Sequence, residues 1–367
     1  MRLAFVSPLP PAPTGVADYA AGLLAELRRH AQVDVLTEAR AGYDNALYHL
    51  GNNPLHLPAY RAALAEPGVA VLHDAVLHHF LLGTLDERAY IEEFVYNYGE
   101  WMRDLGRELW RSRSRSSSDR RYFQYPLLRR VVDRSRAVVV HNPGARRIVE
   151  AVVPGKQVAE IPHYFISRAL PGEAPRTRER LGIGAEEIVI GTFGYLRDSM
   201  RMRSILKALP AVPRARFLLV GEFVSADLER SLAPLLAACG VIRTGHVSED
   251  EFWRLAEITD IVVNLRDPSA GETSGIGIKM MGIGKPVLVT AGEETAAFPE
   301  LAVIRIDPGE AEVEMLAEYL RALAGSEEMR REIGRRAAQH IAENHTLERA
   351  AKMYLDLVAE TTIHNFR

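Results

Sequence analysis

The sequence predicts an α/β protein made of two doubly wound halves, and three observations support this fold class. A chain of 367 residues is long enough for two domains. Short apolar runs typical of strands alternate with stretches of helical periodicity, which indicates parallel sheets covered by helices on both faces. A stretch rich in Pro, Gly and Arg, from Pro171 to Arg180, separates these elements into two sets.

In the first set, the strand Leu3 to Ser7 ends at several prolines and is followed by Gly15 and a helix from Val16 to about His30. The other expected strands of this half are 33–36, 45–50, 69–72 and 137–140. Ligands of parallel sheets bind beyond the carboxyl ends of the strands. We therefore expect Gly15, the loop at Asn52, and His73-Asp74 to line one rim.

The second set has six expected strands, which are 188–193, 217–221, 241–243, 261–265, 286–290 and 303–306. Apolar residues at helical spacing predict a last helix from about Leu347 to Thr361. The expected domains are therefore residues 1–170 and 171–346, followed by the helical segment 347–367.

The segment from Ser269 to Thr290 is the first candidate site. Its sequence predicts a Gly-rich loop from Gly271 to Gly275, then a helix that ends at Gly284, and then an apolar strand. Free backbone N–H groups and the positive end of the helix can hold an anionic ligand there. The segment therefore suits a ligand that carries phosphate and hydroxyl groups.

The sequence GETSG, followed by a helix and GKPV and preceded by DIVVNL, resembles the donor-binding segment of retaining glycosyltransferases of the GT-B class, family 4. The resemblance covers nearly the whole chain and is strongest from Glu272 to Thr290. It implies two Rossmann-like domains that face a cleft, with the last helix crossing back onto the first domain. It also implies a nucleotide diphosphate sugar as donor, with UDP or GDP expected, and no metal ion or other cofactor.

The sequence departs from this family pattern within the donor segment. Gly271 and Lys279 stand where the family has two Glu residues that hold the donor sugar and the ribose, and Glu272 follows one position late. Unit charges about 4 Å apart interact by about 4 kcal/mol at an effective dielectric constant of about 20. We therefore expect Lys279 near the diphosphate or the ribose and Glu272 at sugar hydroxyls. The alternative is a solvated Lys279.

A second departure follows the strand that ends at Gly194. Tyr195 and Met200 occupy the places where the family has an Arg and a Lys on the diphosphate. Either Arg197 and Arg201 bind the diphosphate in their place, or the pocket binds the diphosphate less tightly. The expected donor-binding residues are Gly15, Arg197, Arg201, Gly245, Glu272, Thr273, Ser274, Gly275 and Lys279.

Histidines follow one strand of the first half. An imidazole at the carboxyl end of a strand can donate to a sugar hydroxyl, and the family often places a His and an acidic residue there. The resemblance therefore implies His73, Asp74 and Glu272 as catalytic residues, with Asn52 and His78 on the acceptor side. The three histidines at 73, 78 and 79 could also bind a metal ion, but their carboxylate neighbours lack the HExxH spacing.

Composition excludes several other classes. The net charge of -3 gives no general attraction to nucleic acid, and the single Cys239 excludes an intrachain disulfide. The N-terminus does not resemble a signal peptide, and no run is long and apolar enough to span a membrane, so a cytoplasmic location is expected. GxGxxG, P-loop and GxSxG motifs are missing, which disfavours hydride transfer, ATP hydrolysis and serine hydrolase chemistry.

One region, from Arg103 to Arg136, is strongly basic. It contains eleven arginines and four acidic residues, a net charge of +7, with aromatic residues interleaved. Such a surface could contact anionic lipid at the inner face of a membrane or an acidic acceptor. The alternative is a solvated helix pair with a flexible loop from Ser112 to Ser118.

Together these features predict a hexosyltransferase that retains anomeric configuration and acts on a hydroxyl acceptor, which could be a glycan, a lipid-linked sugar or a small glycoside. An epimerase of nucleotide sugars with the same two-domain plan is the first alternative. A non-catalytic relative that binds a nucleotide or a partner protein is the second, because the family residues at 195, 200 and 279 are replaced.

Overall fold

The computed structural model describes residues 1–168, 170 and 172–363. The chain forms two compact units. The first comprises Met1–Tyr164, Pro268–Thr273 and His345–Arg367, and the second comprises Phe165–Asp267 and Ser274–Asn344. The chain thus divides a few residues before the expected boundary at 170, and a short piece of the donor segment belongs to the first unit. Pro171 and residues 364–367 of the expected segments lie outside the described residues.

The first unit is built on a parallel six-stranded sheet with the order β2-β1-β3-β4-β5-β6. Its strands are β1 (Arg2–Val6), β2 (Gln32–Val35), β3 (Asn45–Leu50), β4 (Val69–Leu72), β5 (Ala137–Val140) and β6 (Val158–Glu160). Most residues of β1, β3, β4 and β5 are buried on both faces, which explains their continuous apolar sequences. The short β6 was not predicted, because only Val158 and its two neighbours pair with β5.

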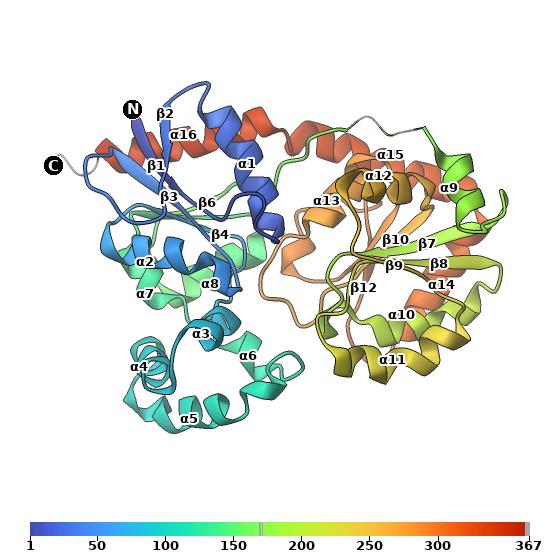
Figure 1. Ribbon diagram of the computed structural model, residues 1–367, viewed down its shortest axis with the longest axis horizontal. Coiled ribbons are helices and arrows are strands. Elements are labelled where there is room, and N and C mark those ends of the chain that lie inside the picture. Colours follow the sequence, from blue (N-terminus) through green and yellow to red (C-terminus); the bar gives the residue numbers. More distant parts are fainter. Residues whose placement is uncertain (169, 171, 364–367) are drawn as a thin grey trace. The chain divides into compact units, whose positions relative to one another are not determined.

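Helices cover both faces of this sheet. One face packs against α1 (Gly15–Leu27) and α16 (Leu347–Ile363), which lie side by side in Figure 1. The hydroxyl groups of Tyr19 in α1 and Tyr354 in α16 are 3.0 Å apart. The other face packs against α2 (Leu57–Ala65), α7 (Arg129–Arg134) and α8 (Pro143–Val152).

A group of helices between β4 and α7 extends this second face and contains most of the basic region (Figure 1). The group consists of α3 (His78–Thr84), α4 (Glu87–Tyr98), η2 (Glu100–Met102), α5 (Arg103–Arg111), η3 (Arg113–Arg115) and α6 (Arg121–Gln124). Buried aromatic residues hold it to the unit, including Tyr90, Phe94 and Tyr122.

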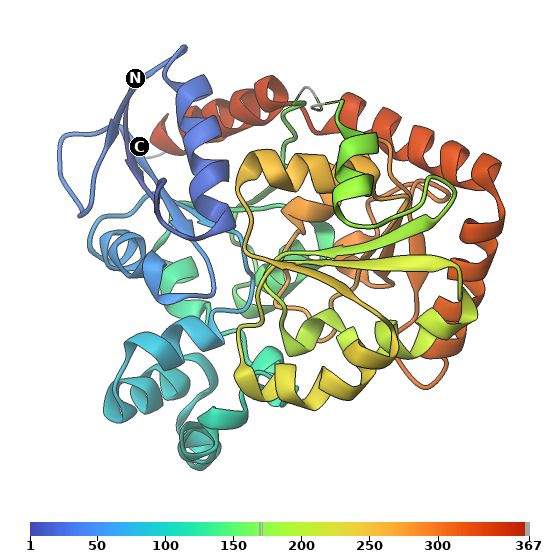
Figure 2. The same ribbon diagram turned by 45° about the vertical axis from the view of Figure 1, so that its right-hand side comes forward.

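The second unit contains another parallel six-stranded sheet, with the order β12-β11-β10-β7-β8-β9. Its strands are β7 (Ile188–Phe193), β8 (Ala215–Val220), β9 (Ile242–Gly245), β10 (Ile261–Asn264), β11 (Val287–Thr290) and β12 (Ile304–Ile306). Figure 2 shows α10 (Met202–Ala208) and α11 (Ala226–Ala238) on one side of this sheet and α12 (Glu249–Ile258) on the other. Both faces are therefore covered, as in the first unit.

The remaining helices complete the two layers of the second unit. α14 (Glu312–Gly325) packs with α10, whereas α9 (Ala174–Arg180) packs with α12 and α13 (Gly275–Gly282) packs with α15 (Glu327–Asn344). Gly284, which has a φ of 76°, lies just after the end of α13, in agreement with the predicted end of this helix. The prediction of two parallel, doubly wound sheets is confirmed by this topology.

Candidate functional site

The start of α13 in the second unit presents free backbone N–H groups. Ser274 is the N-cap, and its hydroxyl oxygen accepts a hydrogen bond from the Gly277 N–H at 3.2 Å. The same hydroxyl donates to Asn264 Oδ1 at the end of β10, at 3.2 Å, which fixes the cap. Because the first N–H groups of a helix have no partner inside it, Gly275 and Ile276 offer donors at the positive end of α13.

The loop after β7 lies against this helix start. A Cβ atom added to Gly194, which follows β7, would be 2.7 Å from the Ile276 side chain. Further along the loop, the Ser199 carbonyl accepts a hydrogen bond from the Asp267 N–H at 2.8 Å. Arg197 stands in this loop with an exposed side chain that forms no ion pair or hydrogen bond within the described part of the chain. A cation and a helix N-terminus therefore lie at the carboxyl ends of the neighbouring strands β7 and β10.

Arg201, in contrast, is already paired. Its Nε lies 3.0 Å from both carboxylate oxygens of Glu312, and an Nη atom lies 3.7 Å from Asp267. Glu312 is 1% exposed, so loss of this arginine would leave a buried carboxyl group without its partner. The structure thus gives Arg201 a structural role in joining α10 to α14, and Arg197 is the arginine of this loop that can meet a phosphate.

Lys279 lies one turn into α13 and faces aromatic rings. Its Nζ is 5.4 Å from the centre of the Phe252 ring and 5.8 Å from that of Trp253, both on α12. Such cation–π contacts are worth about 0.5–1 kcal/mol at exposed sites. Lys279 forms no ion pair with the described residues, so its charge is available to an anionic ligand.

Three neighbouring strands of the second sheet end in glycines with positive φ. These are Gly194 after β7, Gly221 after β8 and Gly245 at the end of β9, with φ of 109°, 131° and 70°. A Cβ atom at Gly221 would lie 2.0 Å from the Gly194 carbonyl oxygen, whereas one at Gly245 would meet nothing within 4 Å. Open space therefore lies beside the half-buried Gly245, where a flat ligand can approach the backbone closely. The roles of Gly194 and Gly221 were missed, although a Gly directly after an apolar strand is a recognisable signal.

The loop before Ser274 belongs to the first unit. Asn142 Nδ2 donates to the Gly271 carbonyl at 3.0 Å and to Thr273 Oγ1 at 2.9 Å. The Glu272 carboxylate accepts from the Ala270 N–H at 2.7 Å and from the Ser269 hydroxyl at 3.2 Å. The side chains of Glu272 and Thr273 thus stabilise the loop conformation, whereas the sequence predicted that they bind the donor.

Buried histidines gather at the carboxyl ends of β3, β4 and β5. His49 Nδ1 lies 3.0 Å from His73 Nε2. The rings of His73 and His141 are 4.8 Å apart, and the Tyr19 ring lies 4.9 Å from His73. His56, which follows β3, donates from Nδ1 to the His49 carbonyl at 2.9 Å. This histidine cluster, consisting of His49, His56, His73 and His141, was not predicted beyond His73.

The cluster is uncharged at neutral pH. Burial lowers the pKa of His73 well below its usual range, and the neighbouring His141 and His49 lower it further. Burial also lowers the pKa of His141 to about 4 and that of His56 to about 4. The pKa of His49 is likewise lowered well below normal, chiefly by burial. These imidazoles can therefore exchange hydrogen bonds as neutral groups.

Gly15, Asn52 and Asp74 are further expected site residues of the first unit. Gly15 is the first residue of α1, exposed, with open space where a Cβ would stand. Asp74 Oδ2 accepts from the Asn52 N–H at 2.7 Å, which brings these two residues of the predicted rim together. Asn52 Oδ1 in turn accepts from the Phe80 N–H at 2.8 Å, near the start of α3.

His78 is occupied inside the helical group. Its Nδ1 lies 2.9 Å from the Tyr125 carbonyl and its Nε2 lies 2.7 Å from the Tyr90 hydroxyl. Burial lowers the pKa of His78 to about 3. Both nitrogens therefore stabilise the fold. Within the described residues, no group of three or more His, Cys, Asp or Glu side chains is arranged to hold a metal ion.

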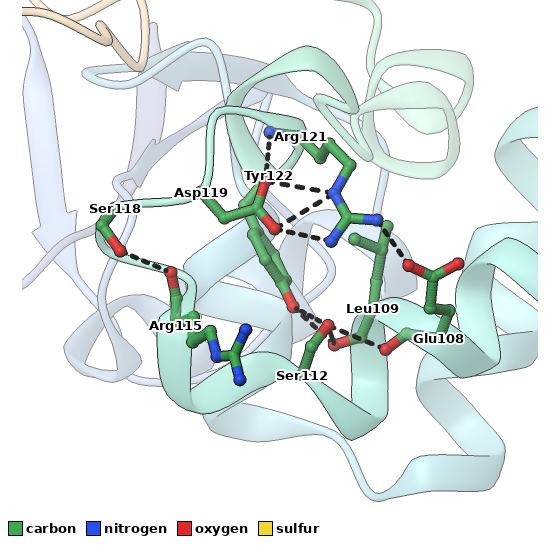
Figure 3. A network of polar contacts seen from close by, with 8 residues as sticks. All are labelled: Glu108, Leu109, Ser112, Arg115, Ser118, Asp119, Arg121 and Tyr122. Atoms are coloured by element: carbon green, nitrogen blue, oxygen red, sulfur yellow. Dashed lines mark hydrogen bonds and ion pairs between the residues drawn. The ribbon is translucent and has the colours of Figure 1, made fainter.

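Ion pairs balance part of the charge of the basic region. Arg121 pairs with Asp119 at 2.7 Å and Glu108 at 2.6 Å, and the neighbouring Tyr122 hydroxyl donates to the Leu109 carbonyl at 2.6 Å (Figure 3). Arg103, Arg107 and Arg130 also form ion pairs. Arg111, Arg113 and Arg115 are exposed and form no ion pair with any described residue. None of the described helices is both long and apolar enough to span a membrane.

Comparison with known proteins places these features in context. A family model described as glycosyl transferase-like matches residues 197–356, which is less than half of the chain. HepE from Anabaena, in complex with UDP and glucose, superposes with a TM-score of 0.70 at 15% identity, over 98% of this chain and 100% of that one. The search of curated proteins finds no match.

Two further solved structures are similar to this chain over almost its whole length. Sucrose-phosphate synthase from Thermosynechococcus elongatus has a TM-score of 0.70 at 14% identity, with 98% of each chain covered. WaaG, a glycosyltransferase involved in lipopolysaccharide biosynthesis, has a TM-score of 0.63 at 13% identity, over 97% of this chain and 99% of that one. The chain has the GT-B fold. The helix start at Ser274 lies within residues 197–356, which the glycosyl transferase-like family model matches.

Proposed function

We propose that the protein is a retaining glycosyltransferase that moves a hexose from a nucleotide diphosphate sugar to a hydroxyl acceptor. The observation that carries this proposal is the start of α13, where free N–H groups adjoin the loop that carries Arg197 and lie one turn before Lys279. Preorganised donors and cations of this kind stabilise the charge that develops on a leaving diphosphate. The solved neighbour HepE, which binds UDP and glucose, has the same fold.

Each residue then has a defined task. Arg197, Lys279 and the N–H groups of α13 bind the diphosphate, and the backbone at Gly245 contacts the base. The neutral His73 offers a hydrogen bond to a sugar hydroxyl. The leaving phosphate itself accepts the acceptor proton, so that no separate general base is needed. Arg201 and Glu272 shape the loops, through Glu312 and through the Ala270 N–H respectively.

A panel of donors tests the reaction directly. The protein is incubated with UDP-, GDP-, ADP- and TDP-sugars without acceptor, and free sugar is measured by mass spectrometry. We expect slow hydrolysis of one donor class, since water can replace the acceptor. Appearance of an isomeric nucleotide sugar, with no free hexose, would instead identify an epimerase. Binding without turnover of any donor, even with added glycan acceptors, would favour the non-catalytic alternative.

We also propose that the protein works in the cytoplasm at the inner face of an anionic membrane, through Arg111, Arg113 and Arg115. These three arginines lie within five residues and have no carboxylate partner in the described chain, while Arg113 stacks on Trp110 at 4.4 Å. Trp101, in the same helical group, is 81% exposed. Tryptophan is favoured at the boundary between lipid and water.

Replacing Arg111, Arg113 and Arg115 together by Gln should weaken sedimentation with vesicles that contain phosphatidylglycerol by about tenfold or more. Each basic residue near an anionic surface contributes about 1 kcal/mol, which salt reduces. Vesicles of phosphatidylcholine alone should bind neither protein. The matched control replaces Arg321, Arg331 and Arg335 of the second unit, which changes the net charge equally. Equal binding by both triple variants would show that no specific surface exists.

A further inference from the structure

The pair formed by His49 and His73 has two possible proton arrangements, and the structure distinguishes them. His49 lies in β3 and His73 directly follows β4, and these strands are neighbours in the sheet. The atoms His49 Nδ1 and His73 Nε2 are 3.0 Å apart. One of them must carry the proton and donate, while the other must accept.

The second nitrogen of His49 decides between the two arrangements. His49 is 0% exposed, and its Nε2 is buried without a hydrogen-bond partner. If the proton were on His49 Nε2, a buried N–H donor would be left without an acceptor. If the proton is on Nδ1, His49 is left with only a bare lone pair, and the N–H without a partner is on His73 Nδ1, which is not among the fully buried unpartnered atoms. Unpaired buried N–H groups are the rarer and more costly defect, so His49 carries its proton on Nδ1.

The proton on His49 Nδ1 determines where His73 carries its own proton. Its Nε2 accepts from His49, so a neutral His73 must carry its own proton on Nδ1. His73 Nδ1 makes no hydrogen bond within the described residues, although His73 is 9% exposed at the carboxyl end of β4. The Tyr19 and His141 rings, at 4.9 Å and 4.8 Å, hold the His73 ring in this orientation.

We propose that His49 is a positioning residue that fixes His73 in the Nδ1–H tautomer, so that His73 can donate a hydrogen bond to a hydroxyl oxygen of the donor sugar. The sugar contact rests on the proposed function, whereas the tautomer does not. The neutral imidazole of a free histidine in water carries its proton mainly on Nε2. The tautomer of His73 is therefore a signature that packing alone would not produce.

The test is a long-range ¹H–¹⁵N NMR spectrum of the full chain labelled at histidine, near neutral pH. His73→Gln serves to assign the signals of His73. We expect protonated Nδ1 and unprotonated Nε2 in the wild-type protein. His49→Leu should shift His73 toward the Nε2–H form, while His49→Asn, whose amide can donate from the place of Nδ1, should keep the native tautomer.

Kinetics separate this inference from the proposed function. For an active donor, His49→Leu should lower kcat by about three- to tenfold, as expected for loss of one neutral hydrogen bond, and His49→Asn should restore most of the rate. If wild-type His73 carries its proton on Nε2, or if His49→Leu leaves its tautomer unchanged, the inference is wrong. If the tautomers change as expected and the rate does not, the positioning role stands and the sugar contact of the proposed function fails.

Discussion

Acidification from about pH 6.5 to pH 4 should remove roughly 6 kcal/mol of stability through His56 and His141 alone. The pKa of each is lowered to about 4 in the folded chain, chiefly by burial, from an ordinary value of 6.5. The unfolded chain therefore binds protons first as the pH falls. Stability is fully present above about pH 6.5 and is lost toward pH 4, below which both states are protonated.

The size of this loss approaches the whole stability of a typical domain, which is about 5–15 kcal/mol. We expect the free energy of unfolding, measured by urea titration, to fall by about 2.7 kcal/mol per pH unit below pH 6.5 from these two groups. In a Trp253→Phe background, which removes the tryptophan of the second unit, fluorescence of the half-buried Trp110 reports on the first unit, which contains the histidine cluster. A free energy that stays level between about pH 7 and pH 5 would contradict this account.

Two variants serve as controls for the acid effect. His141→Asn keeps a donor for the Ile161 carbonyl, which His141 Nδ1 reaches at 2.8 Å, but cannot titrate. Its unfolding free energy should depend on pH less steeply, by about one proton. His246 is exposed in the second unit, and His246→Ala should keep the wild-type slope.

Reversal of the charge at Lys279 should weaken nucleotide binding by about a hundredfold. A full unit charge about 4 Å from a phosphate contributes about 4 kcal/mol at an effective dielectric constant of about 20, and partial exposure reduces this. Lys279→Glu exchanges attraction for repulsion and also removes the contacts with Phe252 and Trp253. The remaining loss corresponds to about 2.7 kcal/mol.

Calorimetry with the nucleotide that binds best provides the measurement. The matched control is Lys207→Glu, because Lys207 is exposed on α10 and the substitution changes the net charge equally. We expect the control to bind like the wild type. Unchanged affinity in Lys279→Glu would remove Lys279 from the binding site.

Most of the strands could be predicted from sequence because they are short apolar runs next to a turn signal, whereas the short β6 could not. β3, β4, β5 and β7 have the predicted bounds. The role of Arg201 could not be predicted, since its partner Glu312 is 111 residues away and belongs to another helix. An arginine in a phosphate-binding loop has the same local sequence whether or not a carboxylate reaches it.

The histidine cluster was hidden for a related reason. His49, His73 and His141 are far apart in sequence and meet only because β3, β4 and β5 are neighbours with carboxyl ends at one edge. Strand order, and not local pattern, decides this. The position of Glu272 depends similarly on the fold of its loop, in which its carboxylate accepts the Ala270 N–H.

The central claim is that the helix start at Ser274, with Arg197 and Lys279, binds the diphosphate of a nucleotide. A thermal-shift screen of the whole protein against UDP, GDP, ADP and TDP tests it most directly. A nucleotide at about 100 times its dissociation constant adds about 2.7 kcal/mol to stability, so at least one should raise the Tm by several degrees. No shift with any of the four would contradict the claim.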